Sequence, residues 1–190
     1  MSETPPIGLD FDNTLVCYDQ IFHRVALELA LIPPSVAPTK TAVRDYLRGI
    51  GQEPKWTELQ GVVYGPRLLE ASPYPGVLEF VDRSQKKGIP LVIVSHKTLH
   101  PIVGPPYDLH QAARRWLDHY LGDSLAAFFE LTKAAKLERI GQIGCSHFVD
   151  DLPEILTDPA FPASVQGILF DPHGHHSQPG LRSVRHFSQL

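Results

Sequence analysis

The sequence predicts an α/β fold built on a parallel, doubly wound sheet. Short apolar runs rich in β-branched residues recur along the chain, and segments with helical periodicity separate them. Polar or charged residues follow directly after several of these runs. Because the carboxyl ends of parallel strands form the ligand-binding edge of such sheets, we expect the functional groups to gather there.

The first strand is predicted around Ile7, Leu9 and Phe11, and it ends in Asp10 and Asp12. Asn13 is expected to stop the strand, since asparagine tolerates left-handed backbone. Two carboxylates so close together repel each other. A cation beside them is therefore expected.

The segment 17–72 is predicted to be a helical insert in the sheet domain. We expect a helix over 20–31, a second helix capped by Thr39, and a poorer third stretch over 56–68 that Gly61 interrupts. Residues 1–16 and 73–190 would then form the sheet domain.

The rest of the chain alternates between helices and strands. Further strands are predicted at 89–94, 125–131, 147–149 and 165–170. Helices are expected over 77–87, from a cap at Asp108 to about residue 121, and after a cap at Thr132. The proline-rich stretch 99–107 is predicted to be a stiff loop.

Composition narrows the class of protein. The chain has 190 residues, a hydrophobic fraction of 43% and a formal net charge of -4, with no run of Lys or Arg. These values argue against a nucleic-acid partner, and no apolar run reaches membrane-spanning length. Cys17 and Cys145 are too few for a disulfide framework. We expect a cytoplasmic protein whose partner is a small molecule.

Four short motifs, in order, resemble those of the haloacid dehalogenase (HAD) superfamily, and the resemblance spans most of the chain. They are Asp10-x-Asp12, Ser95 after the second strand, a lysine after the third, and the pair Asp150-Asp151. The resemblance implies that Asp10 is a nucleophile, that Asp12 is a general acid and base, and that Ser95 holds phosphate oxygens. It also implies Mg²⁺ held by Asp10, the backbone carbonyl of Asp12, and the acidic pair.

Two residues are candidates for the motif lysine. Lys133 is expected to be the first residue of its helix and so nearest to the strand ends, which favours it. Lys136 lies one turn further along. Because long side chains lean toward the amino terminus of a helix, Lys136 also has the reach, and it stays a candidate.

The acid at Asp12 indicates a phosphatase within this family, because the resemblance implies a different residue at that position in dehalogenases and P-type pumps. The insert would correspond to a small helical cap. The predicted function is a Mg²⁺-dependent phosphatase that hydrolyses a small soluble phosphomonoester through an aspartyl phosphate. A phosphotransferase or mutase, and a catalytically silent binding module on the same fold, remain alternatives.

Other residues carry weaker signals. His96 either touches a leaving group or only caps a loop, and the tail histidines are either a metal site or a solvated loop. Basic residues of the insert either bind the substrate or form a solvated face. The residues concerned are Arg44, Arg48 and Arg67 in the insert and His173, His175 and His176 in the tail.

Overall fold

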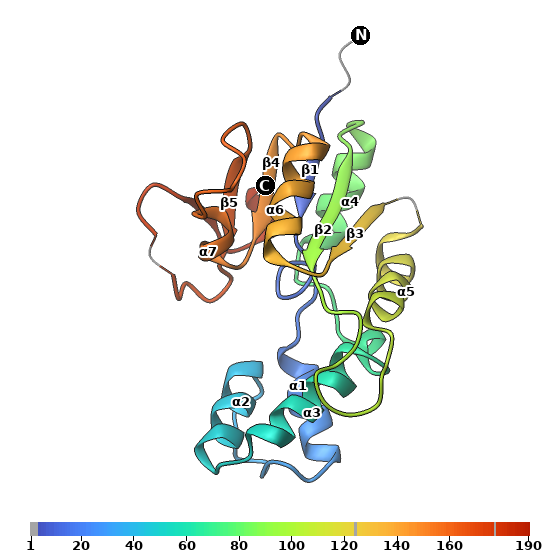
Figure 1. Cartoon of the computed structure of the whole chain (residues 1–190), viewed down its shortest axis with the longest axis vertical. Coiled ribbons are helices and arrows are strands. Elements are labelled where there is room, and N and C mark those ends of the chain that lie inside the picture. Colours follow the sequence, from blue (N-terminus) through green and yellow to red (C-terminus); the bar gives the residue numbers. More distant parts are fainter. Residues whose placement is uncertain (1–3, 124, 177) are drawn as a thin grey trace. The chain divides into compact units, whose positions relative to one another are not determined.

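The computed structural model describes residues 4–123, 125–176 and 178–190. The chain forms two compact units (Figure 1). The first unit consists of Met1–Val16, Pro73–Lys97 and Tyr120–Leu190, and the second consists of Cys17–Ser72 and Thr98–His119. The second unit thus contains the predicted insert together with a segment that the sequence prediction assigned to the sheet domain.

The first unit is built on a parallel sheet, as predicted. Among the described residues, six strands follow the order β3-β2-β1-β4-β5-β6, and every neighbouring pair is parallel. The strands are β1 (Ile7–Leu9), β2 (Leu91–His96), β3 (Ala126–Glu130), β4 (His147–Asp150), β5 (Gln166–Phe170) and β6 (Arg182–Val184). The first five match the predicted strands, with ends that differ by a few residues. Strand β6 was not predicted because its three residues include only one apolar side chain.

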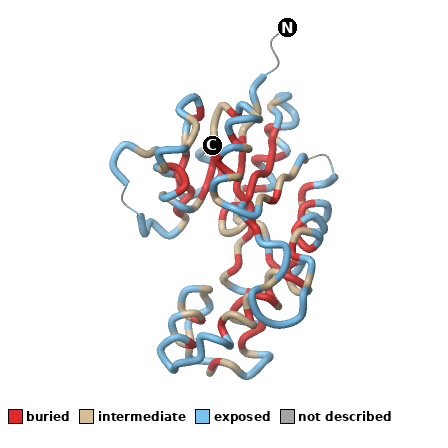
Figure 2. The backbone as a smooth tube through the Cα atoms, in the orientation of Figure 1, coloured by how far each residue is buried: buried red, intermediate tan, exposed pale blue. Residues whose placement is uncertain are grey.

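Helices cover both faces of this sheet. They are α4 (Val77–Lys86), α6 (Lys133–Ile143), α7 (Pro153–Leu156) and the short 3₁₀ helix η2 (Phe187–Gln189). On one face, Ile140 of α6 and Leu156 of α7 lie in a buried cluster with Val94 of β2. On the other face, the ring of Phe187 lies 5.6 Å from that of Phe80 and 5.0 Å from that of Phe170. Figure 2 shows most of the central strands β2, β1, β4 and β5 as buried, so the groups at their carboxyl edge rest on a packed core.

The second unit is helical. Its elements are α1 (Asp19–Glu28), α2 (Lys40–Gly49), α3 (Glu53–Tyr64), the 3₁₀ helix η1 (Leu68–Glu70) and most of α5 (Leu109–Leu121). The predicted caps are confirmed: Thr39 accepts a hydrogen bond from the backbone N–H of Ala42 at 3.1 Å, and Asp108 accepts one from that of Gln111 at 2.7 Å. No helix in the described part of the chain has the length and apolarity that a bilayer span requires.

Two features of this unit differ from expectation, and both involve the segment 98–119. Helix α3 continues through Gly61, where a Cβ atom would lie 3.0 Å from Pro101, so the missing side chain allows the loop to approach closely. Trp116 is fully buried, and its indole N–H donates to the carbonyl of Ala71 at 2.7 Å. These contacts explain why the segment belongs to the helical unit, although loop composition alone gave no sign of them.

Candidate active site

The central strands β2, β1 and β4 deliver polar side chains to the carboxyl edge of the sheet. Strands β1 and β4 pair with Leu9 opposite Val149, so Asp10 and Asp150 are neighbours one residue further on. The backbone N–H of Asp10 donates to the carbonyl of Val149 at 2.9 Å and fixes this alignment. Asn13 adopts a φ of 59°, the left-handed conformation expected for it, although strand β1 already ends at Leu9.

A buried ammonium group lies between the two carboxylates. Lys136 Nζ donates to Asp10 Oδ1 at 2.6 Å and to Asp150 Oδ2 at 2.5 Å. The relative exposures are 5% for Asp10, 2% for Lys136 and 0% for Asp150. The second Asp150 oxygen accepts the backbone N–H of Leu152 at 2.9 Å. Three ionisable groups are therefore held in fixed positions with little access to water.

The electrostatics of this cluster favour an additional cation. Burial by itself lowers the pKa of Lys136, but the charges of Asp10 and Asp150 outweigh burial and raise it, so the ammonium stays protonated. Burial raises the pKa of Asp150 well above its usual range, despite the opposing effect of Lys136. One lysine thus only partly compensates two buried carboxylates.

The expectation that Lys133 rather than Lys136 would lie nearest the nucleophile is corrected here. Lys133 Nζ pairs with Asp158 Oδ2 at 2.6 Å and donates to the carbonyl of Glu154 at 2.9 Å. Lys133 is the first residue of α6, where Thr132 caps the helix by accepting from Ala135 at 3.1 Å. Lys136, one turn further in, lies on the buried side of α6 and extends back toward the strand ends.

A second ion pair was not predicted from the sequence. Lys97 Nζ donates to the two carboxylate oxygens of Asp12 at 3.0 and 2.8 Å. Lys97 is 5% exposed and directly follows strand β2. Asp10 was identified because it is a charged residue at the end of an apolar strand. The same criterion would have identified Lys97 as a candidate site residue.

Three carboxylates converge at the carboxyl edge of the sheet. Asp10, Asp150 and Asp151 each offer an oxygen, and these atoms lie within 4.8 Å of one another. Thr14 Oγ1 lies 3.4 Å from Asp151 Oδ1 and orients it. Such an all-oxygen set fits Mg²⁺. The side chain of Asp12 is instead engaged by Lys97, and a metal contact through its backbone carbonyl stays a prediction.

Comparisons with known proteins rest on solved structures, because no family model and no curated protein matches the sequence. An L-2-haloacid dehalogenase is 12% identical with a TM-score of 0.62, over 99% of this chain and 97% of that one. A predicted phosphoglycolate phosphatase from Haemophilus somnus 129pt is 17% identical with a TM-score of 0.54, over 90% and 86%. The chain has the HAD fold. The resemblance that the motifs predicted is confirmed at the level of the fold.

A third neighbour bears on the metal. A HAD-hydrolase-type protein from Bacillus subtilis, whose structure is bound to magnesium, is 14% identical with a TM-score of 0.58, over 99% of this chain and 97% of that one. The ion belongs to that protein. For this chain, the support for a metal is the acidic cluster at the carboxyl edge of its own HAD fold.

Two further residues of the second motif lie at the end of β2. Ser95 is 1% exposed at the carboxyl edge of the HAD sheet. His96 is exposed, and its Nε2 lies 3.2 Å from the carbonyl oxygen of Leu131. This contact is the kind expected if His96 caps a loop, which was one of the two roles predicted for it.

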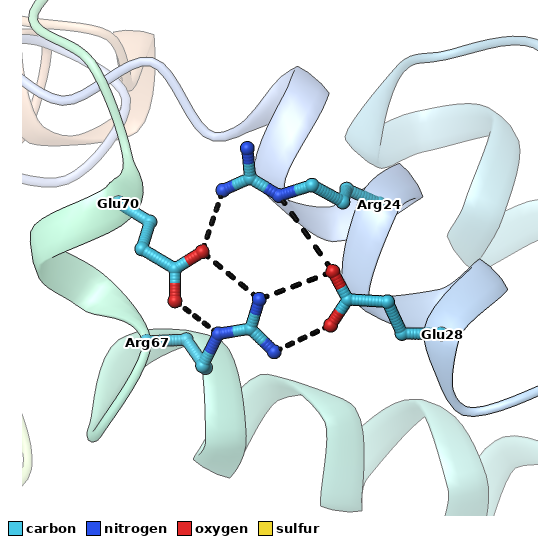
Figure 3. A network of polar contacts seen from close by, with 4 residues as sticks. All are labelled: Arg24, Glu28, Arg67 and Glu70. Atoms are coloured by element: carbon cyan, nitrogen blue, oxygen red, sulfur yellow. Dashed lines mark hydrogen bonds and ion pairs between the residues drawn. The ribbon is translucent and has the colours of Figure 1, made fainter.

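The guanidinium groups proposed to bind substrate are each engaged by carboxylates of the helical unit. Arg44 pairs with Asp45 at 2.9 Å, and Arg48 contacts Glu53 at 2.6 and 3.0 Å. Arg67 lies between Glu28 and Glu70, and Arg24 completes a four-residue network (Figure 3). A role in substrate binding stays a prediction for these arginines. To bind a substrate, each would have to release a carboxylate that it now contacts.

The histidine-containing tail follows strand β5. Asp171, 4% exposed, accepts the backbone N–H groups of His175 at 3.0 Å and His176 at 2.9 Å. The rings of His173 and His175 stack with centroids 5.3 Å apart. Among the described residues, the potential metal ligands that lie close together are the carboxylates of the acidic cluster, and the three tail histidines are not part of that group.

Proposed function

We propose that this chain is a HAD-superfamily hydrolase, specifically a Mg²⁺-dependent phosphatase that acts on a small phosphorylated metabolite through an aspartyl phosphate on Asp10. The neighbours in fold include both dehalogenases and phosphatases, so the fold alone does not choose between them. The choice rests on the residues at the carboxyl edge of the sheet.

The observation that carries the proposal is the separate placement of two acids. Asp10 is buried against Lys136, while Asp12 is held by a different lysine, and its side chain remains 23% exposed. A nucleophile and a proton-transfer group need different surroundings, and these two acids have them. A halide leaves without needing a proton, whereas hydrolysis of a phosphomonoester must protonate an alkoxide leaving group, which is the task proposed for Asp12.

The residues support a two-step reaction. An oxygen of Asp10 forms a bond to phosphorus as the bond to the leaving oxygen breaks, and the carboxyl group of Asp12 gives its proton to that oxygen. In the second step, the Asp12 carboxylate takes a proton from water, the water oxygen bonds to phosphorus, and Asp10 is released with inorganic phosphate. Lys136 holds Asp10 in place, and Ser95 is positioned to hold a phosphate oxygen.

Mg²⁺ bound by Asp10, Asp150 and Asp151 would neutralise charge that Lys136 leaves uncompensated, which allows a phosphate dianion to approach the nucleophile. The substrate proposed is small because the charge of -4 and the lack of basic runs give no footprint for a polyanion. We propose a cytoplasmic location because the chain's two cysteines, Cys17 and Cys145, are too few for a disulfide framework.

The test is a screen with two readouts. Phosphorylated metabolites and 2-haloacids are incubated with the protein, with Mg²⁺ or with chelator, and released phosphate and halide are measured in parallel. We expect phosphate release that depends on Mg²⁺, and no halide. Halide release, or phosphate release that survives thorough chelation, would contradict the proposal.

A further inference from the structure

Lys97 is a buried cation whose side chain forms an ion pair with Asp12, the proposed general acid and base. Its ammonium donates to both oxygens of Asp12, at 3.0 and 2.8 Å, and lies 5.4 Å from the centre of the Phe11 ring. Its backbone N–H donates to the carbonyl of Glu130 at 2.8 Å. Lys97 is therefore anchored to strand β3 through its backbone, and its side chain reaches across to Asp12.

The two buried lysines pair with different acids of the proposed mechanism. Lys136 contacts Asp10 and Asp150 at 2.6 and 2.5 Å, on the side of the nucleophile and the metal. Lys97 contacts Asp12, on the side where protons are exchanged. A buried ammonium group is tolerated only beside a partner, so this placement is specific. An ammonium that touches both oxygens also restricts rotation of the carboxyl group.

We propose that Lys97 is a positioning residue for Asp12, an inference that rests on the proposed phosphatase function. Lys97 transfers no proton. It holds the carboxyl group of Asp12 in one orientation, so that the same side chain faces the leaving oxygen in the first step and the attacking water in the second. Proton transfer requires a well-aligned donor and acceptor, and a carboxyl group that rotates freely loses that alignment.

The predicted kinetic signature follows from this role. Alkyl phosphates have poor leaving groups and need the proton from Asp12, whereas 4-nitrophenyl phosphate needs little protonation in the first step. Lys97→Met should lower kcat for an alkyl phosphate by about 10-fold or more. The loss in the first step with 4-nitrophenyl phosphate should be much smaller. KM should change little, because Lys97 acts through Asp12 and does not bind the substrate.

The experiment is a double-mutant cycle with Lys97→Met, Asp12→Asn and the combined variant, each with Mg²⁺ and both substrates. Single-turnover measurements with 4-nitrophenyl phosphate follow the first step even where turnover is slow. If Lys97 acts through Asp12, its replacement costs less than about 3-fold in the Asp12→Asn background, because coupled residues are not additive. Lys86→Met, which removes an exposed ion pair with Asp82 on α4, is the matched control and should be unaffected.

Each outcome separates the two levels of the proposal. If the parent protein is active and the Lys97→Met variant is unimpaired, the proposed role of Lys97 is wrong but the phosphatase proposal stands. Equal losses in the parent and Asp12→Asn backgrounds overturn it as well, since Lys97 would then act on the substrate directly. A parent protein inactive on every phosphomonoester overturns the phosphatase proposal and this inference with it. If circular dichroism shows that Lys97→Met does not fold, Lys97→Arg is measured in its place. An arginine that still holds Asp12 should keep the parent protein's ratio of alkyl phosphate to aryl phosphate rates.

Discussion

Replacing Lys136 by methionine removes the ammonium group that two buried carboxylates share, while nearly keeping the length of the side chain. Asp10 and Asp150 would then face each other at relative exposures of 5% and 0%. With an effective dielectric constant of about 20, a contact of 2.6 Å is worth about 6 kcal/mol before desolvation is subtracted. Loss of one partner of a buried ion pair lowers the free energy of unfolding by about 3–5 kcal/mol, and we expect a loss in that range for Lys136→Met without metal.

The assay is equilibrium unfolding in urea, followed by far-ultraviolet circular dichroism in the presence of a chelator. Lys133→Met is the matched control on the same helix, because its side chain is 41% exposed and pairs with Asp158 at the surface. A loss below about 1 kcal/mol is expected for this control. Mg²⁺ should stabilise Lys136→Met more than the parent protein, since the ion supplies the missing positive charge. Equal losses in the two lysine variants would refute the assignment of Lys136 to the cluster.

Three further predictions concern residues outside the acidic cluster. Gly8→Ala should lower the free energy of unfolding by about 1–3 kcal/mol, because the added Cβ would collide with the Phe148 ring. Cys145 should resist alkylation in the native protein while Cys17 reacts faster, because burial raises the pKa of the Cys145 thiol to about 11. Backbone hydrogen bonds outweigh burial and lower the pKa of Asp171. The stability that Asp171 contributes is therefore present above pH 3.8 and is lost as pH falls through the lower folded value, and Asp171→Asn should remove this pH dependence.

Each of these has a direct check. A melting temperature for Gly8→Ala equal to that of the parent would show that the strand relaxes freely around the new methyl group. Mass spectrometry after brief iodoacetamide treatment locates the modified cysteine, and equal labelling of both thiols would contradict the burial argument. Parallel acid titrations of the Asp171→Asn variant and the parent protein should diverge below about pH 5, and coincident curves would contradict the role of Asp171.

The sequence was most informative where a strand ends. Asp10, Asp12 and Asp150 stand directly after apolar runs, so their meeting at one edge follows from parallel topology alone. The choice between Lys133 and Lys136 was different. Lys133 begins α6 and Lys136 lies one turn further along. Which of them faces the sheet depends on how the helix packs, and the local sequence pattern does not contain that information.

Long-range packing also decided the features that were missed. The buried Trp116 places the segment 98–119 in the helical unit through its bond to Ala71, a contact between residues far apart in the chain. The position of Lys97 directly after β2 marks it as a candidate site residue. Its pairing with Asp12 could not be predicted, because it depends on β1 and β2 being neighbours in the sheet. Whether the helical unit closes over the acidic cluster as a cap stays a prediction of the sequence.

The central claim is that Asp10 carries the phosphoryl group and that Asp12 is needed to release it. The most direct measurement is a rapid-quench experiment with labelled 4-nitrophenyl phosphate, followed by mapping of the labelled residue. In Asp12→Ala we expect label to accumulate on Asp10 toward one per active chain, since the leaving group needs little protonation but water is no longer activated. In Asp10→Asn no label should appear. Label on another residue, or a burst that persists in Asp10→Asn, would contradict the account.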